Sequence, residues 1–370
     1  MGRTQRKWLA RAAVTLAVVS TLLVGVGTAT ASAHSYRRGP WGPPVTLADG
    51  LVGPLQIDAV GDGSVLVAQG FASTISRVAR NGKVTDLAHE EGLETPAVAA
   101  GPFGSVFYTR NNDGGSTSDL MVRDASGRTR RFADLGKHET NKNPDQIRTY
   151  GIEGDVSPEC AAQLPAEVGP PNYTGLVDSH PYALAMTPFG VMVADAAGNT
   201  ILLVDWTGKV RTVAVLPVQP TVITADFAAT NGLPDCILGR TYNFEPVPTD
   251  VEVGRDGKLY VTTLPGGPED PSLGARGSVY RVNPWTGRST RIATGFAGAT
   301  NLAVSPDGTI YVAELFANRI SEVRNGGPVP VVDLNQPGAV EWSNGRLVAT
   351  SDVFGAGKVV VIGRGGPPTS

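Results

Sequence analysis

Short apolar runs alternate with glycine turns along nearly the whole chain. Six times, a dipeptide ending in Gly is followed by a few apolar or β-branched residues and then by a polar residue. The turn glycines are Gly63, Gly104, Gly190, Gly257, Gly308 and Gly345. Such runs are typical of β-strands that leave a tight turn, and their recurrence indicates a repeat architecture. Six copies predict an all-β fold, a six-bladed β-propeller.

A second turn signal divides the repeats into pairs of hairpins. In the first five repeats it ends at Gly82, Gly127, Gly208, Gly287 and Gly327. Dipeptide turns of this kind between alternating apolar runs are strong hairpin signals. Each blade is therefore expected to contain four antiparallel strands. In the fifth repeat these strands are predicted at residues 301–304, 309–313, 319–323 and 328–333.

The two ends of the chain predict how the ring closes. The sixth repeat supplies strands near residues 339–342, 346–350 and 358–362, and the chain then ends without a fourth. Residues 44–48 resemble the outermost strands of the other repeats. We expect this N-terminal strand to complete the last blade, which leaves no open sheet edge inside the ring. The predicted propeller spans residues 44–365, between a linker at 34–43 and a tail at 366–370.

Two long insertions, residues 136–181 and 218–249, interrupt the period. Both connect the outermost strand of one blade to the innermost strand of the next, so we expect both on one elaborated face. Repeat proteins usually bind their partners on such a face. The two cysteines, Cys160 and Cys236, lie one in each insertion. In an exported chain they predict a disulfide that braces this face; the alternative is two buried free thiols.

The first 33 residues have the pattern of a signal peptide. Basic residues between Arg3 and Arg11 precede an apolar run at 12–26, and a small-residue motif ends at Ala33. This run is too short to anchor a protein in a bilayer. We therefore expect Sec-dependent secretion with cleavage after Ala33, and no membrane anchor.

Charge narrows the classes of partner. The chain has 31 Lys and Arg against 34 Asp and Glu, and the leader holds four of the basic residues and no acid. The mature chain would therefore carry 27 basic and 34 acidic residues. An acidic secreted protein is not expected to bind nucleic acid or anionic membranes. We expect a monomer.

Several stretches resemble known propellers. Residues 301–320 resemble an NHL-type repeat. More widely, the chain resembles the ScyD/ScyE family of exported six-bladed propellers, on the evidence of residues 178–184, 247–257 and 274–283. The resemblance covers nearly the whole mature chain and implies the fold and export. The family brings no established activity, so the resemblance implies no catalytic residue.

Polar side chains at strand ends and in loops of the elaborated face are the candidate site. The candidates for ligand binding are Arg110, Asp178, His180, Tyr182, Asp195, Asp250, Arg276, Asn301 and Glu314. The oxygen atoms of Asp195, Asp250, Asn301 and Glu314 could converge on a divalent cation such as Ca²⁺. The alternative is that each side chain caps a loop or pairs with a neighbour.

One histidine and five aromatic residues add to these candidates. His180, between Asp178 and Tyr182 in the neighbouring sequence, is the candidate general acid or base, or else a residue that positions its loop. The aromatic residues are Tyr173, Tyr182, Tyr242, Phe244 and Phe316. They could stack on a flat or sugar ligand, or they could seal the insertions against the blades.

Two functions are compatible with this pattern. The first is a binding protein that takes a small molecule, a glycan or a protein partner on its elaborated face. The second is a metal-dependent hydrolase or lactonase of the gluconolactonase-like propeller type. Gln69 and Arg110 stand where such an enzyme would need an acidic metal ligand. We therefore expect a binding protein rather than an enzyme.

Overall fold

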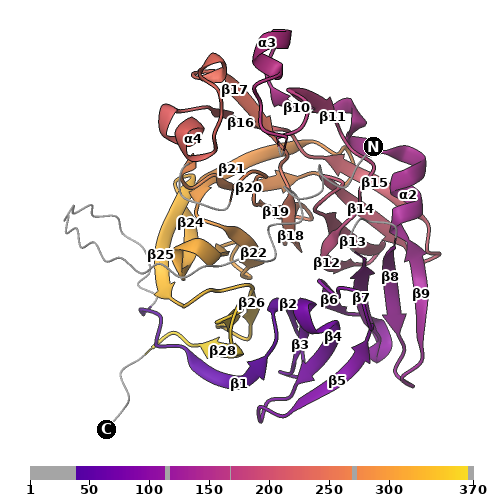
Figure 1. Ribbon diagram of the computed structural model, residues 1–370. Helices are drawn as coiled ribbons and strands as arrows, with labels where there is room; N and C mark the ends of the chain where they lie inside the picture. The colour runs from indigo at the N-terminus through magenta and orange to yellow at the C-terminus, as the bar shows by residue number, and fades with distance from the viewer. Residues whose placement is uncertain (1–38, 113–116, 167, 269–272, 366–370) are drawn as a thin grey trace.

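The computed structural model describes residues 39–112, 117–166, 168–268 and 273–365. Its strands form seven four-stranded antiparallel sheets, most of which are arranged around a common centre in Figure 1. This architecture is that of a β-propeller, as the repeat predicts. The proposed leader and the C-terminal tail lie outside the described residues. Within the described ranges, no helix is long and apolar enough to cross a membrane.

Six of the sheets are built from the sequence repeats. The first three consist of β2 (Pro54–Ala59), β3 (Val65–Gln69), β4 (Thr74–Val78) and β5 (Val84–His89); β6 (Val98–Ala100), β7 (Val106–Asn111), β8 (Ser118–Arg123) and β9 (Thr129–Asp134); and β12 (Pro181–Thr187), β13 (Gly190–Asp195), β14 (Thr200–Asp205) and β15 (Val210–Val215). The next two consist of β18 (Pro248–Val253), β19 (Leu259–Thr263), β20 (Gly277–Val282) and β21 (Ser289–Phe296); and β22 (Ala299–Val304), β23 (Ile310–Glu314), β24 (Arg319–Arg324) and β25 (Gly327–Asp333). The last contains β26 (Val340–Ser343), β27 (Arg346–Ser351) and β28 (Gly357–Ile362).

The innermost strands hold these six sheets in a ring. Strand β2 contacts β6, and successive contacts through β12, β18, β22 and β26 lead back to β2. The core lies between neighbouring sheets: Met192 of β13, for example, belongs to the same buried cluster as Val251 of β18 and Val261 of β19. The tight turns between strands require glycine, because Gly63 and Gly308 have φ angles of 79° and 84°, which side chains with a Cβ rarely adopt.

The N-terminal strand completes the last of these sheets. Strand β1 (Val45–Leu51) pairs antiparallel with β28, in the order β1-β28-β27-β26. The paired residues include Val45 and Val361. This confirms the closure predicted from residues 44–48: β1 covers an edge that the C-terminal strands alone would leave open.

The two insertions form a seventh sheet, which the sequence pattern did not reveal. We call it the insertion sheet. It has the order β11-β10-β17-β16, with β10 at Thr149–Ile152, β11 at Asn172–Thr174, β16 at Gln219–Val222 and β17 at Thr241–Phe244. Helices α3 (Pro158–Ala161) and α4 (Ala225–Thr230) pack with it, whereas α2 (Leu135–Lys142) contacts β8 and β15. Short 3₁₀ turns occur at Gly70–Ala72, Pro102–Gly104, Pro144–Ile147, Asp235–Ile237 and Leu315–Ala317.

The predicted disulfide is present and ties the two insertions together. Cys160 of α3 is bonded to Cys236, with a distance of 6.0 Å between the Cα atoms. Around it, Ile152, Phe227 and Phe244 form part of a small apolar core. The insertion sheet, α3 and α4 project beyond the ring at the upper edge of Figure 1. The elaborated face is thus a structured layer with its own core.

Candidate functional site

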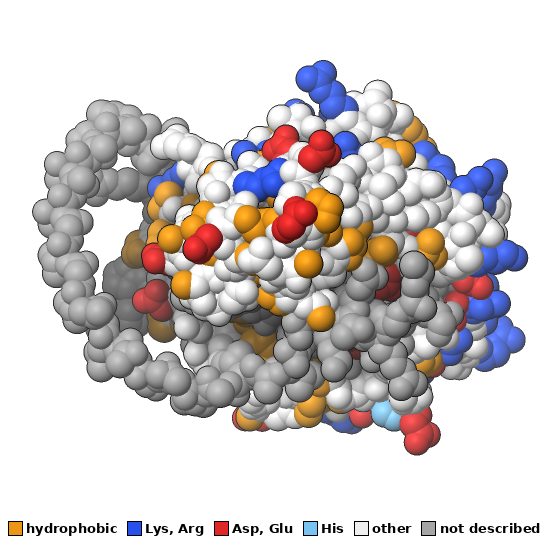
Figure 2. Space-filling view, turned by 45° about the horizontal axis from the view of Figure 1, so that its top comes forward, with side chains coloured by type: hydrophobic (Ala, Val, Ile, Leu, Met, Phe, Trp, Pro, Cys, Tyr) orange, Lys and Arg blue, Asp and Glu red, His pale blue; other side chains and the backbone are white. Residues whose placement is uncertain are grey.

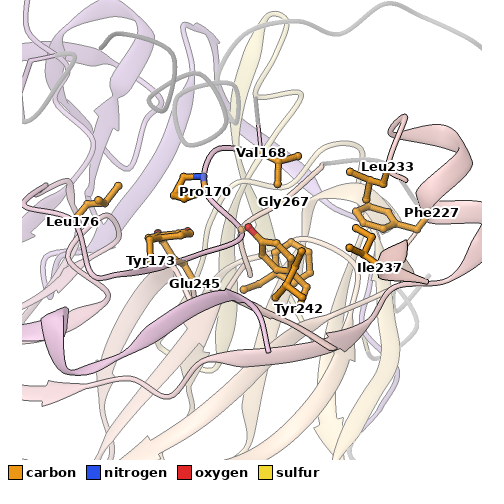
Figure 3. Close-up of a pocket in the computed structure, with 13 residues that line it drawn as sticks. Val168, Pro170, Tyr173, Leu176, Phe227, Leu233, Ile237, Tyr242, Glu245 and Gly267 are labelled. Carbon is orange, nitrogen blue, oxygen red and sulfur yellow. The ribbon is translucent and has the colours of Figure 1, made fainter. Parts of the chain in front are cut away.

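A cavity of about 80 Å³ lies in the insertion sheet. Its lining includes Tyr173 of β11, Tyr242 and Phe244 of β17, and Phe227 of α4. Figure 3 shows Phe227, Leu233 and Ile237 on one side, Tyr173 and Glu245 on the other, and Tyr242 between them. The wall is therefore mainly aromatic and aliphatic, with an acid at one end.

Glu245 is the acidic residue of this cavity, and only 4% of its surface is exposed. Its Oε1 accepts a hydrogen bond from the Tyr173 hydroxyl at 2.8 Å, and its Oε2 accepts one from Asn199 Nδ2 at 3.4 Å. Burial raises the pKa of Glu245 to about 7, and the charges of Asp145 and Asp178 also raise it, while the two hydrogen bonds lower it. The carboxyl can therefore take either protonation state near neutral pH.

Two more acids are buried near this part of the fold: Asp145, which shares the Asn199 amide with Glu245, and Glu139, which is affected by the charge of Asp145. Both carboxylate oxygens of Glu139 and Oδ1 of Asp145 lack a hydrogen-bond partner. Burial, reinforced by the charge of Asp195, raises the pKa of Glu139 to about 9. Asp145 accepts hydrogen bonds from Tyr150 and Asn199 through Oδ2, and burial raises its pKa to about 6. These acids make the surroundings of the cavity electronegative whenever they ionise.

Asp195 contacts the loop that carries His180, and the charges of Asp178 and Asp195 both act on the His180 ring. The buried Asp195 accepts hydrogen bonds from Ser179 Oγ at 2.6 Å and from the His180 backbone N–H at 2.7 Å. His180 Nε2 lies 3.1 Å from Oε2 of Glu94. Burial would lower the pKa of His180, but the charge and hydrogen bond of Glu94 outweigh it and raise the pKa. Asp195 thus holds the loop that contains Ser179 and His180. His180 itself is paired with Glu94, an acid that the sequence analysis did not single out.

Asp250 and Asn301 connect neighbouring inner strands. Oδ2 of Asp250 accepts the backbone N–H of Leu302 at 2.8 Å, and Oδ1 of Asn301 accepts that of Val340 at 2.7 Å. Asn301 Nδ2 also donates to Gln56 Oε1 at 2.7 Å. Each side chain thus binds the backbone of the next sheet around the ring.

Glu314 is occupied within its own sheet. It accepts hydrogen bonds from the Ala297 backbone N–H at 2.8 Å and from Arg319 Nε at 2.7 Å. In the part of the chain that the structure describes, no group of three or more His, Cys, Asp or Glu side chains could hold a metal ion. The four residues proposed to bind Ca²⁺ do not share a site. Their side-chain oxygens accept hydrogen bonds from separate loops and from neighbouring sheets.

The remaining candidates form ion pairs, contact aromatic rings or line the cavity. Arg110 forms salt bridges with Glu90 at 2.9 Å and Asp119 at 3.0 Å. The guanidinium carbon of Arg276 lies 4.5 Å from the centroid of the Phe244 ring. The Tyr182 ring is 6.0 Å from the His180 ring. Of the five aromatic residues singled out in the sequence, Tyr173, Tyr242 and Phe244 line the cavity, whereas Tyr182 and Phe316 are not among its lining residues.

The inner strands carry further acids that the sequence analysis missed. Glu252 lies two residues after Asp250 on β18, and Glu341 lies on β26. Burial is the main cause that raises the pKa of both, and each is also affected by the charge of Asp58 on β2. The acidic alternation on β18 is a signal that would have pointed to this group.

Comparisons with known proteins show similarity at the level of the fold. No family model matches the sequence, and no curated protein matches it. An aldose sugar dehydrogenase from Streptomyces coelicolor, solved with bound PQQ, is 12% identical, with 88% of this chain and 98% of that chain covered and a TM-score of 0.54. A putative glucose dehydrogenase from Thermus thermophilus is 15% identical, with 86% and 99% covered and a TM-score of 0.52. A putative gluconolactonase is 13% identical, with 87% and 91% covered and a TM-score of 0.51. One propeller scaffold carries several chemistries, so these similarities establish no activity for this chain.

Proposed function

We propose that this protein is a secreted binding protein that takes a small molecule in the cavity of its insertion sheet. In this proposal, six of the seven sheets are the blades of the propeller and the insertion sheet is an accessory layer. The ScyD/ScyE resemblance and the predicted leader support the same six-bladed, exported form. The observation that carries the function is the cavity, which combines a mainly aromatic and aliphatic wall with the acid Glu245.

The walls of this cavity are organised before any ligand arrives. The Tyr173 hydroxyl is held by Glu245, and the Tyr242 and Phe244 rings pack with their centroids 4.5 Å apart. The Cys160–Cys236 disulfide joins the insertions that supply these walls. Small-molecule sites typically combine a concave, mostly apolar surface with a few well-placed polar groups, and a preformed site loses less entropy on binding.

The metal-dependent hydrolase has no comparable observation in its favour. The contacts of Asp195, Asp250, Asn301 and Glu314 tie loops and sheets together. A glycan or a protein partner remains compatible with the same face. Figure 2 shows hydrophobic and acidic side chains interspersed on this side of the molecule, with Lys and Arg gathered at one flank.

A variant that fills the cavity tests the proposal. Gly266 lines the cavity, and a Cβ placed there would meet its nearest neighbours at 3.8 Å or more, an ordinary contact. We would screen mature protein against small aromatic, sugar and amine compounds by ligand-observed NMR. The hits should weaken at least tenfold in Gly266→Leu and keep their affinity in Gly61→Leu, whose Cβ would meet nothing within 4 Å. Equal binding to both variants, or no hits at all, would refute a cavity ligand.

A further inference from the structure

The cavity has the walls of an ammonium site. Tyr173, Tyr242, Phe244 and Phe227 present aromatic rings to it from three different elements. The face of an aromatic ring is electronegative and attracts cations, and several rings around one space favour a quaternary or protonated amine. Phe244 already has a cation near its ring, because the guanidinium carbon of Arg276 lies 4.5 Å from its centroid.

The acid in this cavity has neutral partners. Glu245 accepts its hydrogen bonds from the Tyr173 hydroxyl and the Asn199 amide, and among the described residues it forms no salt bridge. Ionised carboxylates that are buried to this degree are normally paired with a cation. A cationic ligand would supply that partner.

The charged groups around Glu245 favour a positive ligand. The acids whose charges act on Glu245 are Asp145 and Asp178. Two arginines lie nearby, and both donate to backbone carbonyls: Arg148 to Val215 and Arg276 to Gly266. Arg276 is not among the residues that line the cavity. Asp145 and Asp178 both raise the pKa of Glu245 through their negative charges, so a cation beside this carboxyl gains electrostatic energy and an anion loses it.

Resting on the proposed function, we propose that the ligand of this cavity is an organic cation, whose ammonium group lies among the aromatic rings and pairs with the Glu245 carboxylate. Binding would then be coupled to a proton. Burial gives free Glu245 a pKa of about 7, and a bound cation stabilises its carboxylate form. Affinity should rise as the pH rises through 7, with a proton released on binding at lower pH.

Matched ligands of equal shape and different charge provide the test. Choline and 3,3-dimethyl-1-butanol differ chiefly in whether the central atom is a charged nitrogen or a carbon; benzylamine and benzyl alcohol form a second pair. By calorimetric or NMR titration at pH 8, at least one cation should bind at least tenfold more tightly than its neutral partner. At pH 5.5 its affinity should fall at least tenfold, because Glu245 is then mostly protonated.

Two pairs of variants assign the preference to the proposed groups. Glu245→Gln should abolish the preference for the cation, whereas Glu159→Gln, an exposed acid of α3, should retain it. Tyr242→Leu should weaken the cation more than its neutral partner, and Tyr242→Phe, which keeps the ring, should not. The second pair of variants keeps the test decisive if Glu245→Gln fails to fold.

The outcomes separate the ligand class from the function. If the neutral compounds bind as tightly as the cations, and Gly266→Leu still weakens both, the cation is wrong and the cavity stands. If no cation binds while neutral sugars or aromatic compounds do, the proposed cation is again wrong and the cavity again stands. If no compound of any charge binds, both the cation and the cavity are refuted.

Discussion

Replacing the buried Glu139 by glutamine should make the protein more stable at alkaline pH. The pKa of this acid is raised from 4.5 to about 9, by burial first and then by the charges of Asp195 and Asp145. Between these two values the folded protein holds a proton that the unfolded chain releases, so the free energy of unfolding falls as the pH rises. At about 1.4 kcal/mol for each pH unit, the loss between pH 4.5 and 8 has an upper limit of about 5 kcal/mol.

Glutamine is neutral throughout this window and has nearly the same shape. Since structural relaxation reduces the upper limit, Glu139→Gln should be about 2–5 kcal/mol more stable than wild type at pH 8, and within about 1 kcal/mol of it at pH 4.5. Urea unfolding followed by circular dichroism at pH 4.5, 6, 7 and 8 measures this. Glu153→Gln, which changes an exposed acid directly after β10, should follow the wild-type curve. If Glu139→Gln also follows that curve, the buried acid does not cause the pH dependence.

Three further predictions concern the scaffold. Reducing Cys160–Cys236 should lower stability by about 2–4 kcal/mol, with hydrogen exchange increasing in the insertion sheet before the blades; uniform exchange would contradict a local brace. Deleting residues 44–51 should expose an edge of β28 and cause aggregation, visible by light scattering, whereas a soluble monomer of unchanged melting temperature would contradict the closure. At pH 6, Asp250→Ala should cost about 1–3 kcal/mol because the Leu302 N–H loses its acceptor, while Asp250→Asn should cost less. A stabilised Asp250→Ala would instead favour relief of repulsion among the inner acids.

One prediction concerns export. Cleavage after Ala33 should leave His34 as the N-terminus of protein recovered from the medium. Intact-mass measurement with and without reduction tests both the cleavage and the disulfide, because alkylation before reduction should add nothing. A retained leader, or two alkylated thiols in unreduced protein, would contradict these expectations.

The strands and their order could be predicted from the sequence because each blade is a local unit. Its strands are joined by short turns, and the turn glycines with positive φ identify where each turn lies. The predicted strand at residues 328–333 differs from β25, Gly327–Asp333, by one residue. The closing strand could also be found, because a propeller with a missing strand at one end needs it from the other.

The insertion sheet could not be predicted in this way. Its strands are three or four residues long and pair across long separations, as Gly151 does with Asn243. Such short segments carry no periodic signal of their own. Of the candidate site, the sequence identified Tyr173, Tyr242 and Phe244 by residue type alone, and it missed Glu245, which looks like any other acid before its burial is known.

The sequence by itself determined the repeat, the turns and the ring closure, because all of these follow from local patterns and from counting. It predicted the cysteine pairing, which the structure confirmed. Only the tertiary structure decided which polar groups share a site. In the structure, Asp250 and Asn301 accept hydrogen bonds from the backbone of neighbouring sheets. Glu245 lines the same cavity as three tyrosine and phenylalanine rings of the insertions, those of Tyr173, Tyr242 and Phe244. The physical reason is that the free energy of a polar side chain depends on its burial and its hydrogen-bond partners, and these are set by residues far away in the chain.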